Sequence, residues 1–263
     1  MTAIAFSIGN FFIEFLTFLG GLSLLFKQSF KEFFKRPHYI YLTIEQIYQI
    51  GIRSMSIVFA AALSTGMVMS LQFGLGLEKF GAKLYVPKIV ALSIAKELGP
   101  VFTSLMLAGR VGAGIASELG SMTVTQQIDA IRALGTSPIK RIVIPRILAC
   151  LIAVPLLTVM ANVIGIIGAA IVGVNELGLD GGFFFQKVYS TVRYFEYATG
   201  IIKTVFFAFF IGITGCYFGL NVKEGTRGVG IATTKAVVTS SILIVISDFF
   251  LSKFLWVLDK WTS

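Results

Sequence analysis

Several ionisable residues interrupt otherwise apolar runs of the chain, and four of them can share one layer: Lys96, Glu97, Lys203 and Asp248. A charged side chain inside a bilayer is costly, so it normally faces protein, an opposite charge or water. At 1.5 Å per helical residue, Glu97, Lys203 and Asp248 lie about 13, 10 and 14 Å from the outer ends of their runs. Two acids and two bases at similar depth form either a salt-bridge network or the polar lining of a cavity for an amphipathic cargo.

A second candidate site lies in the connection between the second and third apolar runs. Ile128 and Ile131 recur at helical spacing after a threonine cap, Thr123 or Thr125, and Gly135 is a typical residue after a helix end. The pattern predicts a short amphipathic helix over residues 125–134. Such a helix rests on lipid and its own bundle, or docks in the groove of a cytoplasmic partner.

Seven residues are the candidates for such docking. They are Thr125, Ile128, Asp129, Ile131, Arg132, Leu134 and Gly135. The Asp-Ala-Ile run of residues 129–131, followed by Gly135, loosely resembles the coupling loop of ABC importers.

The residues needed for nucleotide hydrolysis or metal chemistry are not found in the sequence. The nearest approach to a phosphate-binding loop, residues 76–82, has Ala82 where the lysine is required. The one histidine, His38, follows Pro37 in a polar junction, and Cys150 and Cys216 lie in apolar runs as small buried side chains. We therefore predict no enzyme activity, no metal and no cofactor for this chain. Any ATP and its magnesium would be bound by a partner, and the ATP would be hydrolysed there.

The composition indicates whether these residues are surrounded by water or by a lipid bilayer. Of 263 residues, 56% are hydrophobic and 13% are charged, with a mean hydropathy of +0.87. A soluble domain of this size is unable to hide so much apolar surface. The net charge of +9 comes from basic residues between the apolar runs, as in topology signals, which argues against a nucleic-acid partner. The chain is therefore predicted to be an all-α integral membrane protein with a single domain over 1–263.

Five segments are long and apolar enough to span a bilayer. They are, approximately, Gly51–Leu77, Pro87–Ser117, Pro145–Asn175, Tyr197–Asn221 and Thr234–Val257. A further helix is expected near residues 176–196, in the connection rich in aromatic residues. Lysines and arginines are more frequent in one set of connections, which predicts a cytoplasmic N-terminus and an external C-terminus.

The N-terminal segment Ile4–Phe34 differs from the five spans. It is rich in Phe and Leu but is interrupted by Gly20, Gly21 and Lys27, and it then turns basic. This pattern is typical of an amphipathic helix in the membrane interface, with lysines reaching the headgroups. A sixth, tilted span is the alternative.

Small residues recur every four positions in the second span. One set is Ala108 and Gly112, and the other is Gly109, Ala113 and Ser117. Such faces let helices approach closely, within one chain or between copies.

Several motifs together resemble the MlaE (YrbE) family of ABC-transporter permeases. They are ELGP at 97–100, AGRVGA at 108–113, ELGSM at 118–122, QQIDA at 126–130, GCYFG at 215–219 and GTRGVG at 225–230. The match covers nearly the whole chain after about residue 40. Lys96 stands where some members have arginine, which keeps the charge but not the two-point donor geometry.

The resemblance implies a homodimeric permease of the bacterial inner membrane with an interfacial helix and five spans per subunit. It implies a cytoplasmic ABC ATPase, a periplasmic MCE-domain protein and, in some members, a small STAS-domain protein. Its cargo would be phospholipid or a related lipid, and the helix at 125–134 would couple to the ATPase. The alternative is an ion-coupled secondary transporter in which Glu97 and Asp248 titrate.

Overall fold

The computed structural model describes residues 2–35, 39–223 and 225–262, and all regular structure in these ranges is helical. His38 and Arg36 lie outside the described residues. Among those described, five helical stretches are long and apolar enough to cross a membrane. They are Ile40–Glu78, Lys83–Val124, Ile139–Asn175, Tyr194–Leu220 and Gly225–Trp261. The prediction of five spans is confirmed.

The helices extend beyond most of the predicted boundaries. The first stretch begins eleven residues early, because α2 (Ile40–Ile50) continues through a 3-10 turn into α3 (Met55–Glu78). The fifth stretch lies within α11 (Gly225–Thr262), which starts before Thr234. Backbone hydrogen bonding continues a helix past the hydrocarbon edge, whereas hydropathy marks only the apolar part.

The second stretch consists of several segments. It contains α4 (Val86–Ser93), a π-helical turn η3 (Ile94–Leu98), α5 (Gly99–Leu107), a second π turn η4 (Ala108–Gly112) and α6 (Ala113–Val124). Pro100, the second residue of α5, has no N–H to offer the carbonyl of Lys96. Wide turns of this kind are common at functional sites.

The remaining spans pack around this segmented helix. The third is α8 (Ile144–Asn175), preceded by the π turn η5 (Ile139–Val143), and the fourth is α10 (Tyr194–Leu220). Helix α3 lies along α8, and α10 contacts α6, α8 and α11. Gly66 meets the backbone of Gly165, where a Cβ would overlap the Gly165 carbonyl. Small residues thus let α3 and α8 approach closely, which is the within-chain role expected of such residues.

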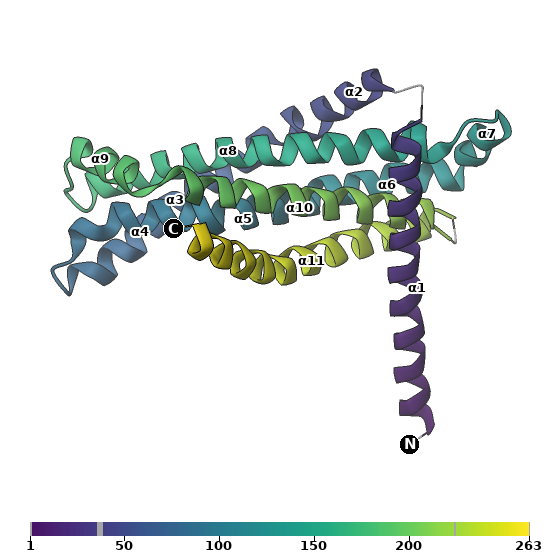
Figure 1. The fold of residues 1–263 in the computed structure, drawn as a ribbon, viewed down its shortest axis with the longest axis horizontal. Coiled ribbons are helices and arrows are strands. Elements are labelled where there is room, and N and C mark those ends of the chain that lie inside the picture. Colours follow the sequence, from purple (N-terminus) through teal and green to yellow (C-terminus); the bar gives the residue numbers. More distant parts are fainter. Residues whose placement is uncertain (1, 36–38, 224, 263) are drawn as a thin grey trace.

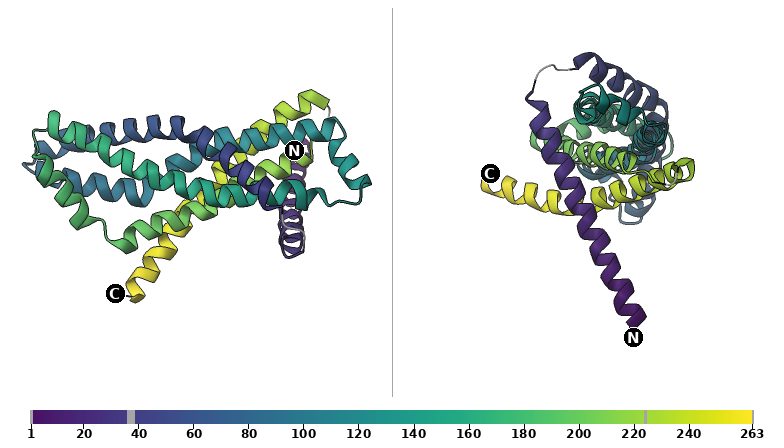
Figure 2. Two further views of the ribbon diagram at one scale, coloured as in Figure 1. Left: turned by 90° about the horizontal axis from the view of Figure 1, so that it is seen from above. Right: turned by 90° about the vertical axis from the view of Figure 1, so that its right-hand side faces the viewer.

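Helix α1 (Thr2–Phe33) crosses the five spans near one end of the bundle instead of running along them (Figures 1 and 2). It is attached through aromatic contacts, with the Phe18 ring 5.4 Å from Tyr217 and the Phe26 ring 5.3 Å from Phe209. At Gly21 a Cβ would overlap the Tyr217 ring. A crosswise direction is what an interfacial helix requires, but its position in a membrane stays a prediction.

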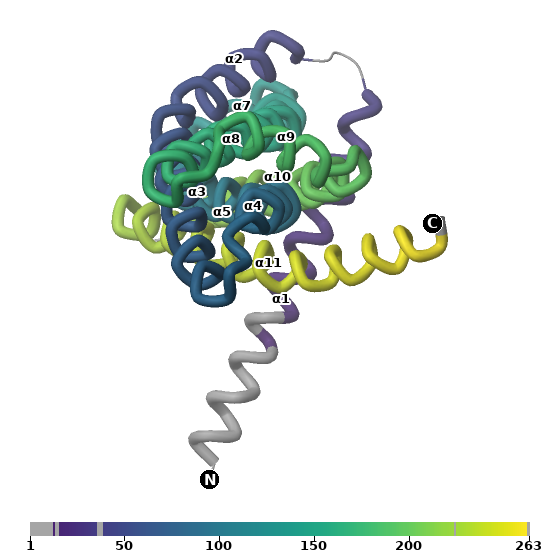
Figure 3. Tube along the Cα trace, turned by 90° about the vertical axis from the view of Figure 1, so that its left-hand side faces the viewer, coloured from purple at the N-terminus to yellow at the C-terminus, as the bar shows by residue number. Residues whose placement is uncertain are grey.

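Two short helices mark opposite ends of the bundle (Figure 1). Helix α7 (Gln127–Ala133) lies at the end crossed by α1, and α9 (Gly181–Thr191) at the other end. The Asp180 carboxylate accepts a hydrogen bond from Phe183 N at 2.8 Å and so caps α9. Viewed along the spans, the end of α11 projects sideways from the bundle (Figure 3).

The predicted threonine cap of α7 is wrong. Because α6 continues through Val124, Thr123 and Thr125 donate hydrogen bonds backwards to the carbonyls of Leu119 and Ser121, each at 2.8 Å. Helix α7 starts at Gln127, two residues later than expected, after a left-handed Gln126 with φ 59°. Gly135 has φ 72°, as expected of a residue after a helix end.

Candidate functional site

Lys203, on α10, is the centre of the buried polar cluster. Its residue is 2% exposed, and its ammonium group uses all three donors. Nζ lies 2.6 Å from Glu97 Oε2, 3.1 Å from Asp248 Oδ1 and 3.2 Å from the carbonyl oxygen of Lys96. One lysine therefore joins the second, fourth and fifth spans, and three of the predicted residues do meet at one depth.

The ELGP run provides the backbone acceptor in this cluster. Proline at position 100 leaves the Lys96 carbonyl without the amide that would pair with it in an α-helix. Lys203 donates to that carbonyl instead. At Gly200, one turn earlier on α10, a Cβ would overlap the carbonyl of Ala95, so glycine lets α10 approach η3 closely enough for this bond.

Gly99 brings a third helix against the same turn. A Cβ there would overlap Oδ1 of Asn162 on α8, whose side chain is fully buried. The tight contact is possible only because residue 99 has no side chain. The glycine and proline of the motif therefore position the polar cluster through the backbone.

Besides its ion pair with Lys203, Glu97 accepts a hydrogen bond from α11. Ser252 Oγ lies 3.2 Å from Glu97 Oε1, one helical turn after Asp248. The Glu97 side chain is 47% exposed, whereas the Asp248 side chain is 22% exposed. Lys203 and its two carboxylates carry a formal charge of −1 when all are ionised. A ligand that enters from outside therefore meets a carboxylate before it meets Lys203.

Lys96 differs from the prediction that its side chain joins the other three. Its Nζ lies 3.3 Å from Glu196 Oε1, in the first turn of α10, and only its carbonyl reaches Lys203. Glu196 and Ser252 were not predicted as site residues. Glu196 lies at the end of the aromatic-rich connection between two predicted spans, and a serine inside a span carries no signal of its own.

A pocket of about 260 Å³ opens beside the cluster. Its walls combine the polar residues with Phe195, Leu255 and Trp256. The full lining is Lys96, Glu97, Phe195, Thr199, Lys203, Ser252, Leu255, Trp256 and Asp259. Charged groups next to apolar walls suit an amphipathic molecule better than a fully polar one.

Helix α7 presents two different faces. Ile128 is 4% exposed and belongs to the main core, and Ile131 packs against the same core. Leu134, just after the helix, is 78% exposed, and the exposed pair Arg132 and Asp129 lies at 3.1 Å. The isoleucines therefore hold α7 on its own bundle, and the outer face is left for other contacts.

An ion pair connects the two spans on either side of α7. Arg146 Nη2 on α8 lies 2.7 Å from Glu118 Oε1 on α6, and Arg146 Nη1 donates to the Ile142 carbonyl at 3.0 Å. The Arg146 side chain is buried. The pair therefore joins α6 to the first turn of α8.

No metal site is apparent in the described ranges, where no three His, Cys, Asp or Glu side chains are placed to hold an ion. Cys150 and Cys216 are free and buried in the main core.

Comparison with known proteins gives one family and several full-length relatives. The family model described as Permease MlaE matches residues 43–254. A probable ABC transporter permease protein of Rickettsia conorii is 38% identical over 250 residues, covering 95% of this chain and 96% of the relative. The intermembrane phospholipid transport system permease protein MlaE of Haemophilus influenzae is 34% identical over 212 residues, covering 80% and 81%. A Synechocystis probable ABC transporter permease protein is 36% identical over 221 residues, covering 84% and 83%.

Proposed function

Because the chain belongs to the MlaE permease family, we propose that it is the membrane-spanning subunit of an ABC transporter that moves phospholipid between the inner and outer membranes of a bacterium. The chain is a multi-pass membrane protein of a lipid-transport permease family. The Haemophilus relative is named for phospholipid transport. The observation that carries the proposal is the Lys203 cluster beside a pocket with apolar walls.

In this proposal the lipid lies with its tails along Phe195, Leu255 and Trp256 and its headgroup at Lys96 and Glu97. Lys203 is too deeply buried to touch the headgroup, so its role is to hold the three spans together. The two wide turns, η3 and η4, interrupt regular α-helical bonding in the second span. Because η3 itself carries Lys96 and Glu97, η4 is the position where that span bends while the cluster stays intact.

ATP is proposed to act from the end of the bundle that bears α7. A cytoplasmic ABC ATPase, which holds ATP and magnesium, contacts the outer face of α7 at Asp129, Arg132 and Leu134. Its movement passes through Ile128 and Ile131 of α7 and the Arg146–Glu118 pair into α6 and α8. The segmented second span then carries the shift to the lipid pocket.

A second copy of the chain is proposed to face η4 and α6. Ala108 and Gly112 pack within the chain, whereas an added Cβ at Gly109 or Gly114 would meet no described atom within 4 Å. Ser117 is exposed on this helix. Close helix contact between two copies would use this open side. The complex in the inner membrane, with a cytoplasmic N-terminus, would also contain an MCE-domain protein and, in some systems, a STAS-domain protein.

The coupling step is tested with two substitutions on α7. Leu134→Asp changes an exposed docking side chain, so we expect lipid-stimulated ATP turnover of the complex to fall about tenfold with an unchanged unfolding temperature. Ala133→Ser, an exposed neighbour, is the matched control and keeps turnover. Equal turnover in the Leu134 variant and the control would contradict docking through this face.

The transport step is tested in proteoliposomes that contain the whole complex and labelled phosphatidylglycerol. ATP-dependent lipid movement that survives a protonophore is expected from the ABC mechanism. Movement abolished by the protonophore while ATP is intact would instead favour the ion-coupled alternative, with Glu97 and Asp248 as the titrating groups.

A further inference from the structure

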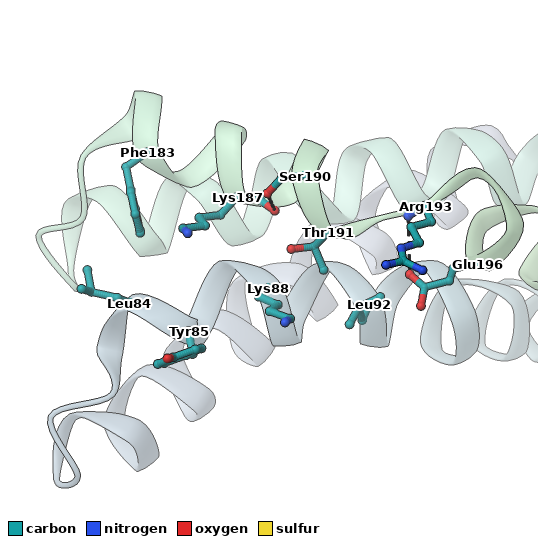
Figure 4. A pocket seen from close by; sticks show the side chains of 10 residues that line it. All are labelled: Leu84, Tyr85, Lys88, Leu92, Phe183, Lys187, Ser190, Thr191, Arg193 and Glu196. Atoms are coloured by element: carbon teal, nitrogen blue, oxygen red, sulfur yellow. Dashed lines mark hydrogen bonds between the residues drawn. The ribbon is translucent and has the colours of Figure 1, made fainter. Parts of the chain in front are cut away.

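A larger pocket, of about 610 Å³, opens at the end of the bundle opposite α7. It lies between α4 on one side and α9 with the start of α10 on the other (Figure 4). The lining residues are Leu84, Tyr85, Lys88, Leu92, Phe183, Lys187, Ser190, Thr191, Arg193 and Glu196. Its volume is within the ordinary range of small-molecule sites, about 300–1,000 Å³.

The charges of this outer pocket are unbalanced. Lys88, Lys187 and Arg193 line it together with a single acid, Glu196. That acid is already engaged, because Oε1 lies 3.3 Å from Lys96 Nζ and Oε2 accepts a hydrogen bond from the Arg193 backbone N–H at 3.5 Å. Among the residues that the structure describes, no carboxylate pairs with the side chains of the three cations.

The other residues that line the outer pocket are of types that contact lipid headgroups. Ser190 and Thr191 supply hydroxyl groups on the wall that α9 forms, opposite Lys88 and Leu92 of α4 (Figure 4). Lys187 Nζ lies 5.4 Å from the centre of the Phe183 ring, and Tyr85 adds a second ring near the rim. Aromatic residues of this kind are enriched at the level of lipid headgroups. Leu84 and Leu92 provide apolar surface beside the cations.

We propose that this outer pocket binds the phosphate of an anionic phospholipid headgroup. Cations without carboxylate partners and nearby hydroxyl groups are what a phosphodiester needs, and the adjoining leucines and aromatic rings accept the apolar part next to it. A small hydrophilic anion such as inorganic phosphate has no apolar part to contact that surface. This inference rests on the proposed function in one respect: lipid transport is what brings a lipid to this end of the bundle.

The outer pocket is connected to the inner one by a single ion pair. Lys88, Leu92 and Lys96 follow one another at four-residue spacing along α4 and η3, on one face. Glu196 lines the outer pocket and Lys96 lines the inner pocket. A phosphate that passes from one to the other therefore replaces Glu196 as the partner of Lys96.

The experiment compares two double variants of the full-length chain in its purified complex. Lys88→Gln/Lys187→Gln removes two charges from the pocket, and Lys79→Gln/Lys253→Gln removes two exposed charges elsewhere. Each complex is titrated with phosphatidylglycerol that carries a photoreactive acyl chain, and cross-links are mapped by mass spectrometry. We expect wild type and control to cross-link α9 and the pocket double variant to bind there about twentyfold more weakly.

The competitors identify the source of the phosphate. An excess of inorganic phosphate should leave the α9 cross-link in place, while unlabelled phosphatidylglycerol should abolish it. Equal cross-linking in both double variants overturns the site. Complete displacement by inorganic phosphate overturns the lipid as its ligand and assigns the pocket to a free anion. Failure of the complex to transport lipid, with the α9 cross-link still sensitive to Lys88 and Lys187, would refute the proposed function alone.

Discussion

The two polar regions of the molecule, the inner cluster around Lys203 and the outer pocket at the end opposite α7, use the same residue types in opposite ways. In the inner cluster, Lys203 is buried and each of its donors has an acceptor. In the outer pocket, Lys88, Lys187 and Arg193 are exposed and have no carboxylate partner within the described chain. A buried charge must be neutralised by the protein, whereas water solvates an exposed charge, which then stays accessible to a ligand. Burial therefore separates the residues that hold the spans together from those that we propose as ligands of the lipid phosphate.

The strongest test of this difference removes one lysine from each region. Lys203→Met leaves Glu97 and Asp248 close together without their shared cation, and we expect a loss of about 3 kcal/mol of folding stability. Lys88→Met, in the outer pocket, should change stability by less than about 0.5 kcal/mol. Thermal unfolding of the purified chain in one detergent measures both. Similar unfolding temperatures for the two variants would remove the distinction between the regions.

A smaller effect is expected from the two serines. Ser252→Ala removes the hydroxyl that donates to Glu97, and we expect it to cost about 1 kcal/mol. Ser190→Ala, in the outer pocket, removes an exposed hydroxyl bonded only to the Lys187 carbonyl of its own helix, and stability should be unchanged. The same unfolding measurement applies. A larger loss for Ser190 than for Ser252 would contradict the assignment of structural bonds to the inner cluster.

The smallest expected effect concerns the ion pair between the regions. Glu196→Gln frees Lys96 from a partly exposed carboxylate, and such pairs contribute little to stability. Because Glu196 competes with phosphate for Lys96, we expect phosphatidylglycerol to bind about threefold more tightly. Titration of the complex with phosphatidylglycerol measures this change, with Glu176→Gln as an exposed control. Weaker binding in the Glu196 variant would show that the carboxylate supports the site rather than competing for it.

The membrane architecture could be predicted because each span is a local property of the chain. About 20 apolar residues are recognisable wherever they occur, and the rise of a helix converts residue number into depth. That arithmetic placed Glu97, Lys203 and Asp248 at one level before any contact was known. The ELGP run and the motifs after it indicated the family for the same reason, because they are contiguous in sequence.

Contacts between segments that lie far apart in the sequence could not be predicted from these local patterns. The partner of Lys96 lies 100 positions further along the chain, and the direction of its side chain is decided by how α10 packs on η3. The outer face of α7 could not be assigned from periodicity either, because the same isoleucines suit a partner's groove and the protein's own core. The cap of α7 was wrong because the preceding helix continued and used the threonine hydroxyls itself.

The sequence by itself determined that this is a membrane protein, that it has five candidate spans and that Glu97, Lys203 and Asp248 share one level, since hydropathy and helical rise act along a single segment. Only the tertiary structure decided which charges are neutralised and which stay exposed. That choice depends on glycine contacts such as Gly99 against Asn162, which bring helices from distant parts of the chain close enough for a buried lysine to reach three acceptors.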